Sequence, residues 1–213
     1  MLKTSSTQDI AKRLSPNSAV ISTLQTEGRG RVGKKWHSEE GGLYLSLNIP
    51  KPENSQELLS LTIGLAVAKL LESFGLNPGI KWVNDIYYQD KKLAGILIEN
   101  LKNSSIIGIG MNVNQRSFPE GLNASSLYLI FKKEFSLKEV ALELFKNIFL
   151  CLKELSESPE EVIKEVSKRL LYVGSVATSK NLTGTFIGIS QNGSALLKSG
   201  GKIFEITSGE LKF

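Results

Sequence analysis

The sequence predicts an α+β fold in which a larger mixed domain precedes a small all-β module. Residues 1–170 alternate apolar strands with helical segments, whereas residues 171–213 contain only short strands separated by turn residues. Hydrophobic residues make up 41% of the 213 residues and charged residues 22%, which is typical of a globular protein with a buried core. We therefore expect two domains, with a boundary after residue 170.

The first part of the larger domain is expected to contain a short helix, two strands and a longer helix. Residues 6–14 fit the short helix and residues 19–26 the first strand. Over residues 43–49, leucine or isoleucine alternates with tyrosine, serine and asparagine, which predicts a strand with only one face buried. The longer helix is expected over residues 55–73, and it ends before Gly75, a residue suited to the left-handed conformation that follows many helices.

A hairpin and a further strand follow the longer helix. Residues 80–88 and 92–100 are strand-like and are separated by a Gln-Asp-Lys turn, so they predict a hairpin. Residues 104–114 form another strand, whose two glycines allow a neighbouring group to approach the backbone closely.

Two helices and four short strands are expected in the remainder of the chain. Capping-box pairs predict helix starts at Ser136, which precedes Glu139 by three residues, and at Ser158, which precedes Glu161. The first of these helices carries an apolar stripe at helical spacing, so one side should pack on the core. The Asn-Gly pair at residues 192–193 predicts a tight turn in the small module. The strands expected in that module are residues 174–180, 183–190, 194–200 and 202–213.

The bulk composition limits the classes of function. The 26 basic and 21 acidic residues give a net charge of +5, which favours an anionic ligand or an acidic partner but is too small an excess for a protein that coats nucleic acid. The single cysteine, Cys151, excludes an intrachain disulfide, indicates the reducing cytoplasm, and lies in an apolar helical segment where we expect it to pack. The longest apolar run, residues 58–71, is shorter than a membrane span, and the N-terminus lacks the apolar core of a signal peptide. We expect no membrane partner.

A segment rich in glycine and basic residues is the first candidate site. Gly28, Gly30 and Gly33 match the dinucleotide-binding template G-x-G-x-x-G, and Gly28, Gly33 and Lys34 match most of the P-loop template. Both templates require a helix after the loop, because the helix N-terminus supplies the amides that bind phosphate. Here a strand follows, and Lys35 replaces the hydroxyl residue of the P-loop. Neither template applies.

The side chains of this segment must therefore bind any phosphate. Its basic residues are Arg29, Arg31, Lys34 and Lys35. They would repel one another unless an anion lies among them, and the alternative is a solvated hairpin neutralised by two nearby glutamates. The glycines favour a ligand, because they allow close approach of the backbone. Trp36 could stack on a base or pack in the core.

A second candidate cluster lies on the predicted hairpin. It contains Lys81, Asn84, Asp85 and Lys92, with Gly95 on the strand that follows. The alternative is a set of ordinary surface charges. Two basic clusters, one carboxylate and one asparagine in a single domain favour a site for a nucleotide together with an acid.

Four segments resemble, in order and at suitable spacing, the signatures of biotin protein ligases. They are GRGRVGKKW (28–36), KWVNDI (81–86), KLAGILIE (92–99) and IGIGMNVN (107–114). The module that ends in SGELKF also resembles the SH3-like domain of that family, so the resemblance covers nearly the whole chain. It implies a catalytic domain with a mixed β-sheet of the biotin/lipoate ligase type and a small C-terminal SH3-like β-barrel. Because the matching region begins within a few residues of Met1, it implies the short form without an N-terminal DNA-binding domain.

The resemblance implies a ligase that uses ATP and biotin as substrates, together with Mg²⁺. Such an enzyme activates biotin to biotinyl-5′-AMP and transfers it to a lysine of a biotin carboxyl carrier protein or domain. The implied enzyme is cytoplasmic, a monomer or a homodimer, and binds neither nucleic acid nor a membrane.

Matching motif by motif, the resemblance also implies roles for individual residues. The implied biotin-binding residues are Ser6, Thr7, Gln25, Gly28, Arg29, Lys92 and Gly95. The implied residues for ATP and the adenylate are Arg29, Gly30, Arg31, Lys34, Trp36, Lys81, Asn84 and Asn112. The implied catalytic residues are Arg31, Lys92 and Asp85. Asp85 either binds Mg²⁺ or orients the acceptor amine, and the sequence leaves both roles open.

The chain departs from the family pattern at three positions. Val83 stands where proline is usual, Gln8 where asparagine is usual, and Lys34 where arginine is usual, which removes a planar group able to grip phosphate with two hydrogen bonds. His37 matches no motif position and is expected to be a bystander. Transfer of lipoate or octanoate is the nearest alternative function, and nucleic-acid binding by the basic segment and the small barrel is a more distant one.

Overall fold

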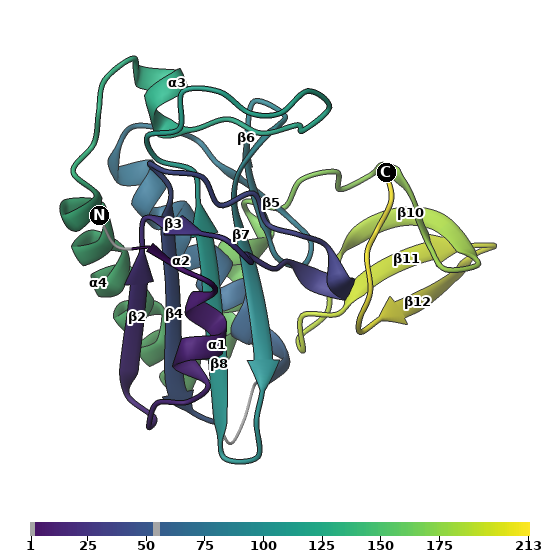
Figure 1. The fold of residues 1–213 in the computed structure, drawn as a ribbon. Helices are drawn as coiled ribbons and strands as arrows, with labels where there is room; N and C mark the ends of the chain where they lie inside the picture. The colour runs from purple at the N-terminus through teal and green to yellow at the C-terminus, as the bar shows by residue number, and fades with distance from the viewer. Residues whose placement is uncertain (1–2, 53–55) are drawn as a thin grey trace.

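The computed structural model describes residues 3–52 and 56–213. Its largest sheet has six antiparallel strands in the order β2-β4-β8-β7-β6-β5 (Figure 1). The strands are β2 (Ser18–Ser22), β4 (Leu43–Pro50), β5 (Gly79–Lys81), β6 (Asp85–Tyr88), β7 (Lys91–Asn100) and β8 (Ser104–Met111). Parallel pairing occurs beside this sheet, where β1 (Lys3–Thr4) pairs with β3 (Leu24–Gln25). The expected fold class is confirmed. The six central strands pair antiparallel with one another, and isolated parallel bridges join Ile80 of β5 to Leu170 and Lys92 of β7 to Ala124.

Helices cover both faces of this sheet (Figure 1). The short helix α1 (Thr7–Ala11) lies on one face against β2 and β4. On the other face, α2 (Leu59–Ser73) packs on the sheet and is covered in turn by α4 (Leu137–Glu157) and α5 (Pro159–Ser167). Because α2 lies between the sheet and α4, nearly all of its surface is buried, and its sequence is apolar on almost every side.

The prediction of a half-solvated strand over residues 43–49 was wrong. Ser46 and Asn48 on the polar face of β4 are 1% and 2% exposed, because α1 covers that face. The Asn48 side chain donates from Nδ2 to the backbone oxygens of Ala11 at 3.1 Å and Leu14 at 2.8 Å, at the C-terminal end of α1. Ser46 and Asn48 therefore bind α1 and the residues just after it instead of water.

The predicted hairpin and helix starts are confirmed with changes of detail. The turn between β6 and β7 lies at Gln89 and Asp90, but residues 80–88 form two strands separated by a turn at residues 82–84. The Ser136 hydroxyl accepts from the Glu139 amide at 3.3 Å, as a capping box requires. Helix α5 begins after Ser158 as predicted, although the side chain of Ser158 makes no capping hydrogen bond.

The remaining elements are short. The expected start of the longer helix, Ser55, lies outside the described residues, and the described part begins with the 3₁₀ turn η2 (Gln56–Leu58). Helix α3 (Leu127–Phe131) was not predicted. Among the described residues, no helix combines the length and the apolar character needed to cross a membrane.

The C-terminal module is a four-stranded antiparallel sheet in the order β12-β11-β10-β9. Its strands are β9 (Val176–Ser179), β10 (Leu182–Ile189), β11 (Ala195–Ser199) and β12 (Lys202–Ile206). The arrangement is compatible with an SH3-like module. Among the described strand pairings β12 is one edge of the sheet, whereas β9 also pairs with the C-terminal segment through a bridge between Thr178 and Lys212. The module contacts the larger domain directly, because Trp82 donates from Nε1 to the Gly193 carbonyl at 2.9 Å. The domain boundary after residue 170 remains a prediction.

Candidate active site

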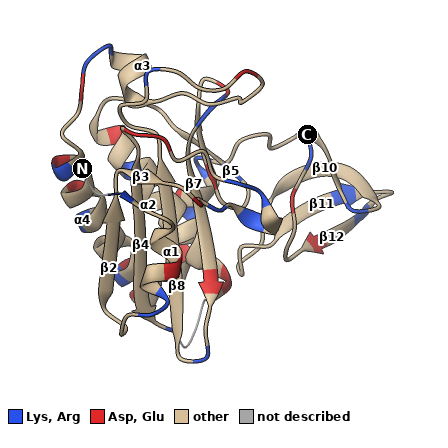
Figure 2. Ribbon diagram, in the orientation of Figure 1, with Lys and Arg blue, Asp and Glu red and all other residues tan. Residues whose placement is uncertain are grey.

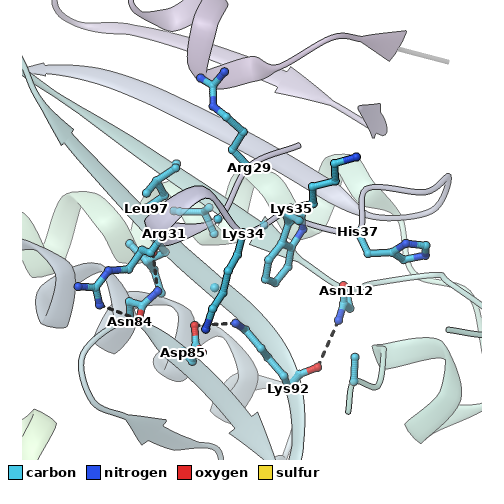
Figure 3. A pocket seen from close by; sticks show the side chains of 18 of the residues that line it. Arg29, Arg31, Lys34, Lys35, His37, Asn84, Asp85, Lys92, Leu97 and Asn112 are labelled. Carbon is cyan, nitrogen blue, oxygen red and sulfur yellow. Dashed lines mark hydrogen bonds and ion pairs between the residues drawn. The ribbon is translucent and has the colours of Figure 1, made fainter. Parts of the chain in front are cut away.

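A cavity of about 290 Å³ lies where α1, the sheet, residues 28–36 and the C-terminal module meet. Residues 28–36 are called the glycine-rich loop below. Every predicted site residue except Gly28 lines this cavity, and Figure 3 labels several of them, among them Arg31, Asp85 and Lys92. The lining residues from that prediction are Ser6, Thr7, Gln25, Arg29, Gly30, Arg31, Lys34, Trp36, Lys81, Asn84, Asp85, Lys92, Gly95 and Asn112. The fold therefore brings together residues that lie up to 106 positions apart in the sequence.

Gly28 and Gly33 shape the glycine-rich loop but do not line the cavity. The Gly28 carbonyl accepts from the Trp36 amide at 2.9 Å, and a Cβ at Gly28 would lie 2.1 Å from Ser38 Oγ. Gly33 has a φ of +72°, the left-handed conformation that favours glycine. Of the three glycines expected to let a ligand approach the backbone, only Gly30 reaches the cavity. The other two are needed for the turn itself.

The glycine-rich loop is a tight hairpin that leads into a strand. The Gly30 amide donates to the Lys34 carbonyl at 2.6 Å, and the 3₁₀ turn η1 (Arg31–Gly33) forms the tip. At that tip Val32 is 90% exposed. The next long element is β4 and not a helix, so the exclusion of both phosphate-loop templates is confirmed.

The guanidinium of Arg29 points away from the cavity in this structure (Figure 3). It forms a two-point ion pair with Asp9 on α1, in which Arg29 Nη1 lies 2.7 Å from Asp9 Oδ2. The hydrogen bond and the charge of Arg29 hold the pKa of the Asp9 carboxyl below its usual value, against a smaller opposing effect of burial. The contact ties the start of the glycine-rich loop to α1.

The deep end of the cavity is a buried network of uncharged polar side chains: Thr7, Gln8, Gln25 and Ser46. Thr7, Gln8 and Ser46 are only 1–4% exposed. Gln25 Oε1 accepts from the Thr7 amide at 2.8 Å, and Gln8 Oε1 accepts from the Ser46 hydroxyl at 2.8 Å. Such a network suits a neutral group that both donates and accepts hydrogen bonds.

The opposite, basic end of the cavity contains Arg31, Lys34 and Lys92, each with a partner inside the chain. Lys92 Nζ lies 2.7 Å from Asp85 Oδ1, and Arg31 Nη1 donates to Asn84 Oδ1 at 3.2 Å. Figure 2 shows that basic residues gather between the large sheet and the C-terminal module. An entering anion would compete with these partners for the cations.

Lys34 connects the glycine-rich loop to the C-terminal module. Its Nζ lies 2.8 Å from Glu210 Oε2, and both side chains are more than half exposed. Glu210 lines the cavity as well. The C-terminal module therefore contributes directly to the basic end.

The indole of Trp36 lies against the large sheet. A Cβ added at Gly95 would lie 2.7 Å from its ring and one at Gly110 2.4 Å, and these two glycines are register partners on β7 and β8. Lys92 Nζ lies 5.0 Å from the centre of a Trp36 ring. Glycine at both positions thus creates a flat surface that the indole covers.

Lys81 and Asn112 are held in place by their surroundings. Lys81 Nζ lies 5.6–5.9 Å from the ring centres of Tyr87, Tyr172 and Phe213. Burial raises the pKa of Tyr87 to about 12, with a further contribution from the Asp85 charge, so this ring stays neutral beside Lys81. The buried Asn112 donates from Nδ2 to the Lys92 carbonyl at 3.2 Å.

The side chains of the site provide enough ligands for Mg²⁺ only when substrate phosphates supply further oxygen ligands. Among the described residues there is no group of three or more histidine, cysteine and carboxylate side chains able to hold a metal. Asp85 is one carboxylate, and Mg²⁺ commonly takes one or two carboxylates together with substrate phosphates and water. Cys151 lies apart from this chemistry: it is buried in α4, and burial raises the pKa of its thiol to about 11.

Sequence reasoning missed several residues that line the cavity. Gln8 was noted only as a departure from a pattern, and Ser46 and Glu210 were assigned no role. Because Gln8 directly follows Ser6 and Thr7 in the sequence, its position could have identified it as a residue of the site. His37, expected to be a bystander, lines the edge of the cavity with Nε2 3.2 Å from a carboxylate oxygen of Glu39.

Comparison with known proteins identifies the family. Residues 3–115 match the model of the biotin/lipoate A/B protein ligase family. The bifunctional ligase/repressor BirA of Bacillus spizizenii is 34% identical over an alignment that covers 98% of this chain and 71% of that protein. The biotin–[acetyl-CoA-carboxylase] ligase of Mycobacterium tuberculosis is 26% identical, with 90% of this chain and 77% of that protein covered.

A solved structure agrees with these sequence matches. The biotin protein ligase of Aquifex aeolicus in complex with biotin and ATP has a TM-score of 0.91 and 38% identity, with 100% of this chain and 96% of that chain covered. Both the family model and a relative above 30% identity thus match a large part of the chain. The chain belongs to the biotin/lipoate A/B protein ligase family, among its biotin protein ligases.

Proposed function

We propose that this chain activates biotin with ATP to biotinyl-5′-AMP and then transfers biotin to a lysine of a biotin carboxyl carrier domain. The observation that carries the proposal is the polarity of one cavity, which has a buried uncharged hydrogen-bonding end and a basic end. Biotin has the same polarity, with a cyclic urea at one end and a carboxylate at the other. Dithiolane ligands such as lipoate have no urea for the deep end to bind.

In the first step, a carboxylate oxygen of biotin attacks the α-phosphorus of ATP and pyrophosphate leaves. Both reactants are anions, so basic side chains must reduce their repulsion and stabilise the charge that develops on the phosphate. We assign this role to Lys92 and Arg31, with Lys34 and Lys81 binding the remaining phosphates. Ser6, Thr7, Gln25, Arg29 and Gly95 are assigned to biotin. Trp36, Asn84 and Asn112 are assigned to the adenine side, with Gly30 beside the phosphate.

In the second step, the amine of the carrier lysine attacks the carbonyl carbon of the mixed anhydride, AMP leaves, and the amine loses a proton. Asp85 could orient that amine, because its carboxylate lies 2.7 Å from the ammonium of Lys92 and thus already accepts a cationic donor. Its other proposed role is to bind Mg²⁺, which would neutralise phosphate charge and be held mainly by phosphate oxygens. Excluding water protects the anhydride, and the glycine-rich loop is placed to do this.

The test is ATP–pyrophosphate exchange by the purified protein with biotin, with lipoate, or with neither. We expect exchange that depends on biotin. Exchange with lipoate alone would keep the fold and the mechanism but change the substrate. A folded protein that binds biotin without exchange would contradict the activation step.

The partner and the location form the remaining part of the proposal. The carrier domain is the expected macromolecular partner, and the enzyme is expected to act as a monomer or a homodimer. We place it in the cytoplasm, since Cys151 is a buried free thiol that suits a reducing compartment.

A further inference from the structure

The glycine-rich loop is fixed by backbone hydrogen bonds just before it begins, but not along its own length. The amides of Thr26 and Glu27 donate to the carbonyls of Thr4 at 3.0 Å and Ser5 at 2.8 Å. The backbone hydrogen bonds of the loop itself join its residues to one another. Side-chain contacts with other elements therefore decide how this hairpin lies at the cavity.

Three polar side chains of the loop make such contacts, each with a different part of the chain. Arg31 and Lys34 lie at the basic end and are proposed to bind the adenylate and the phosphates, so a ligand competes with their protein partners. The guanidinium of Arg29 points away from the cavity instead (Figure 3). Of the three contacts, the one made by Arg29 is therefore the one that a bound ligand leaves in place. The pairs are Arg29 with Asp9, Arg31 with Asn84, and Lys34 with Glu210.

The contact between Arg29 and Asp9 also has the best geometry of the three. Arg29 Nη1 lies 2.7 Å from Asp9 Oδ2 and Nη2 contacts Oδ1, so the planar guanidinium meets both carboxylate oxygens. Two parallel hydrogen bonds fix the direction of the arginine as well as its distance. Arg31 makes one hydrogen bond of 3.2 Å to a neutral amide, and Lys34 makes one ion pair between side chains that are more than half exposed.

Asp9 is held on a firm support. It belongs to the first turn of α1, which packs against β2 and β4. Lys12, on the same side of this helix, has its Nζ 3.8 Å from Asp9 Oδ1 and 2.7 Å from Glu99 Oε1 on β7. The hydrogen bond from Arg29, and less strongly the charges of Arg29 and Lys12, hold the pKa of the Asp9 carboxyl below its usual value against an opposing effect of burial. Asp9 is therefore ionised at neutral pH and tied to the sheet.

We propose that Asp9 is a positioning residue that anchors the glycine-rich loop at the cavity through Arg29, and thereby slows release of the adenylate. The inference deepens the proposed function and rests on it. When phosphates take Arg31 and Lys34 from their protein partners, the contact with Asp9 keeps the start of the hairpin in place. The guanidinium of Arg29 serves as the anchor, and its backbone is the part that faces biotin.

The substitution that tests this is Asp9→Asn, which keeps the shape of the side chain and removes its charge. The dissociation rate of radiolabelled biotinyl-5′-AMP should rise about fivefold, the upper end of what a partly exposed ion pair contributes. Hydrogen exchange is measured in parallel on the ligand-free protein, where the hydrogen-bonded amides of Gly30 and Trp36 should lose protection. A purely structural role for Asp9 would lower Tm and leave both quantities at their wild-type values.

A double-mutant cycle with Arg29→Gln separates anchoring from direct contact with the ligand. If the guanidinium acts only through Asp9, the two single variants and the double variant should all release the adenylate at about the same rate. A guanidinium that binds the ligand would instead make Arg29→Gln worse than Asp9→Asn, and it would add a further loss in the Asp9→Asn background. Arg29→Gln also serves on its own if Asp9→Asn does not fold, because Arg29 is exposed.

Glu99→Gln is the matched control. The side chain of Glu99 is 32% exposed, as is that of Asp9, and it also forms an ion pair with α1. Its partner in that pair is Lys12, and Glu99 is not among the residues that line the cavity. Removing its charge should leave adenylate release and the amide exchange of the loop at their wild-type values.

Two outcomes would overturn the inference. One is wild-type adenylate release together with wild-type amide exchange in folded Asp9→Asn or, if that variant does not fold, in Arg29→Gln. The other is additive loss in the double variant. Both would leave the proposed function intact, because they presuppose a wild-type protein that forms the adenylate. A wild-type protein that forms none would contradict the proposed function, and amide exchange in the ligand-free loop would still test the anchor.

Discussion

The two ends of the cavity are built in different ways. At the deep end, the side chains of Thr7, Gln8 and Ser46 are almost completely buried and bind one another and the backbone of the sheet. At the basic end, Arg31 and Lys34 are more exposed, and each is held by a single partner from another part of the chain. The deep end is stabilised by the same packing that stabilises the fold.

This difference separates recognition from chemistry. Exposed ion pairs contribute little free energy, so an entering polyanion can replace a partner such as Glu210 at small cost. A buried hydrogen-bonded network cannot rearrange without leaving further polar groups unpaired, which costs more. The deep end is therefore fixed and selects the ligand. At the basic end, the cations can exchange their protein partners for phosphate as the charge of the substrate changes during the reaction.

The largest effect is expected for Lys92→Ala at the basic end. Removing one member of a desolvated charged contact costs about 2–5 kcal/mol, which corresponds to a loss of about thirtyfold to several thousandfold in kcat/KM for adenylate formation. Pyrophosphate exchange measures this loss. Lys146→Ala, which removes an exposed cation on α4, is the matched control and should behave as wild type. If the rate of pyrophosphate exchange in Lys92→Ala stayed within about threefold of the wild-type rate, Lys92 would have no role in adenylate formation.

A smaller loss is expected for Arg31→Ala, and it should appear in a different step. Arg31 lies in the glycine-rich loop and is proposed to hold the adenylate, so the variant should release biotinyl-5′-AMP about thirtyfold faster, at the lower end of the range for a charged contact. The dissociation rate of radiolabelled adenylate measures this. Arg116→Ala removes an exposed arginine paired with Glu134 and serves as control. Unchanged release in Arg31→Ala would mean that the loop holds the adenylate without this side chain.

The sequence predicted the basic end better than the deep end. The cations of the glycine-rich loop are adjacent in the chain, and the strand after them was sufficient to exclude two phosphate-binding templates. Ser46 was missed because an alternating pattern normally indicates a solvated face, and nothing in the strand itself shows that α1 will cover it. Asp9 as the partner of Arg29, and Gly95 and Gly110 beneath Trp36, depend on contacts between distant segments. Local sequence patterns therefore indicate candidate site residues, whereas the packing of distant segments determines which groups each residue contacts.

Substitutions at two glycines of β8 compare the rigidity of the two ends through their effects on protein stability. A Cβ at Gly108 would lie 2.7 Å from Gln8 Oε1, whereas one at Gly110 would lie 2.4 Å from the Trp36 indole. Gln8 is fixed by its hydrogen bonds, so Gly108→Ala should destabilise the protein by about 1–2 kcal/mol and lower Tm by a few degrees. Trp36 belongs to the loop and can move away, so Gly110→Ala should lower Tm less while changing the tryptophan fluorescence. Equal losses would show that the loop is as rigid as the deep end.

The smallest effect is expected for the ion pair between Lys34 and Glu210. The hydrogen bond from Lys34, followed by its charge, lowers the pKa of Glu210 below the ordinary value of 4.5. Because the pKa is lower in the folded state, the pair stabilises the protein above pH 4.5, and this contribution is lost as the pH falls through the lowered value. With both side chains more than half exposed, we expect the difference in stability between wild type and Glu210→Gln to be below about 1 kcal/mol at pH 7.

Thermal unfolding of wild type and Glu210→Gln at two pH values and two salt concentrations measures this contribution. The difference in Tm should be small at pH 7 and low salt. It should shrink as the pH is lowered through the depressed pKa of Glu210, and also in about 1 M salt, where screening is nearly complete. A difference that is large and independent of salt would mean that the C-terminal module holds the glycine-rich loop firmly. The basic end would then be as fixed as the deep end, and ligand binding would have to break this contact before the phosphate could reach Lys34.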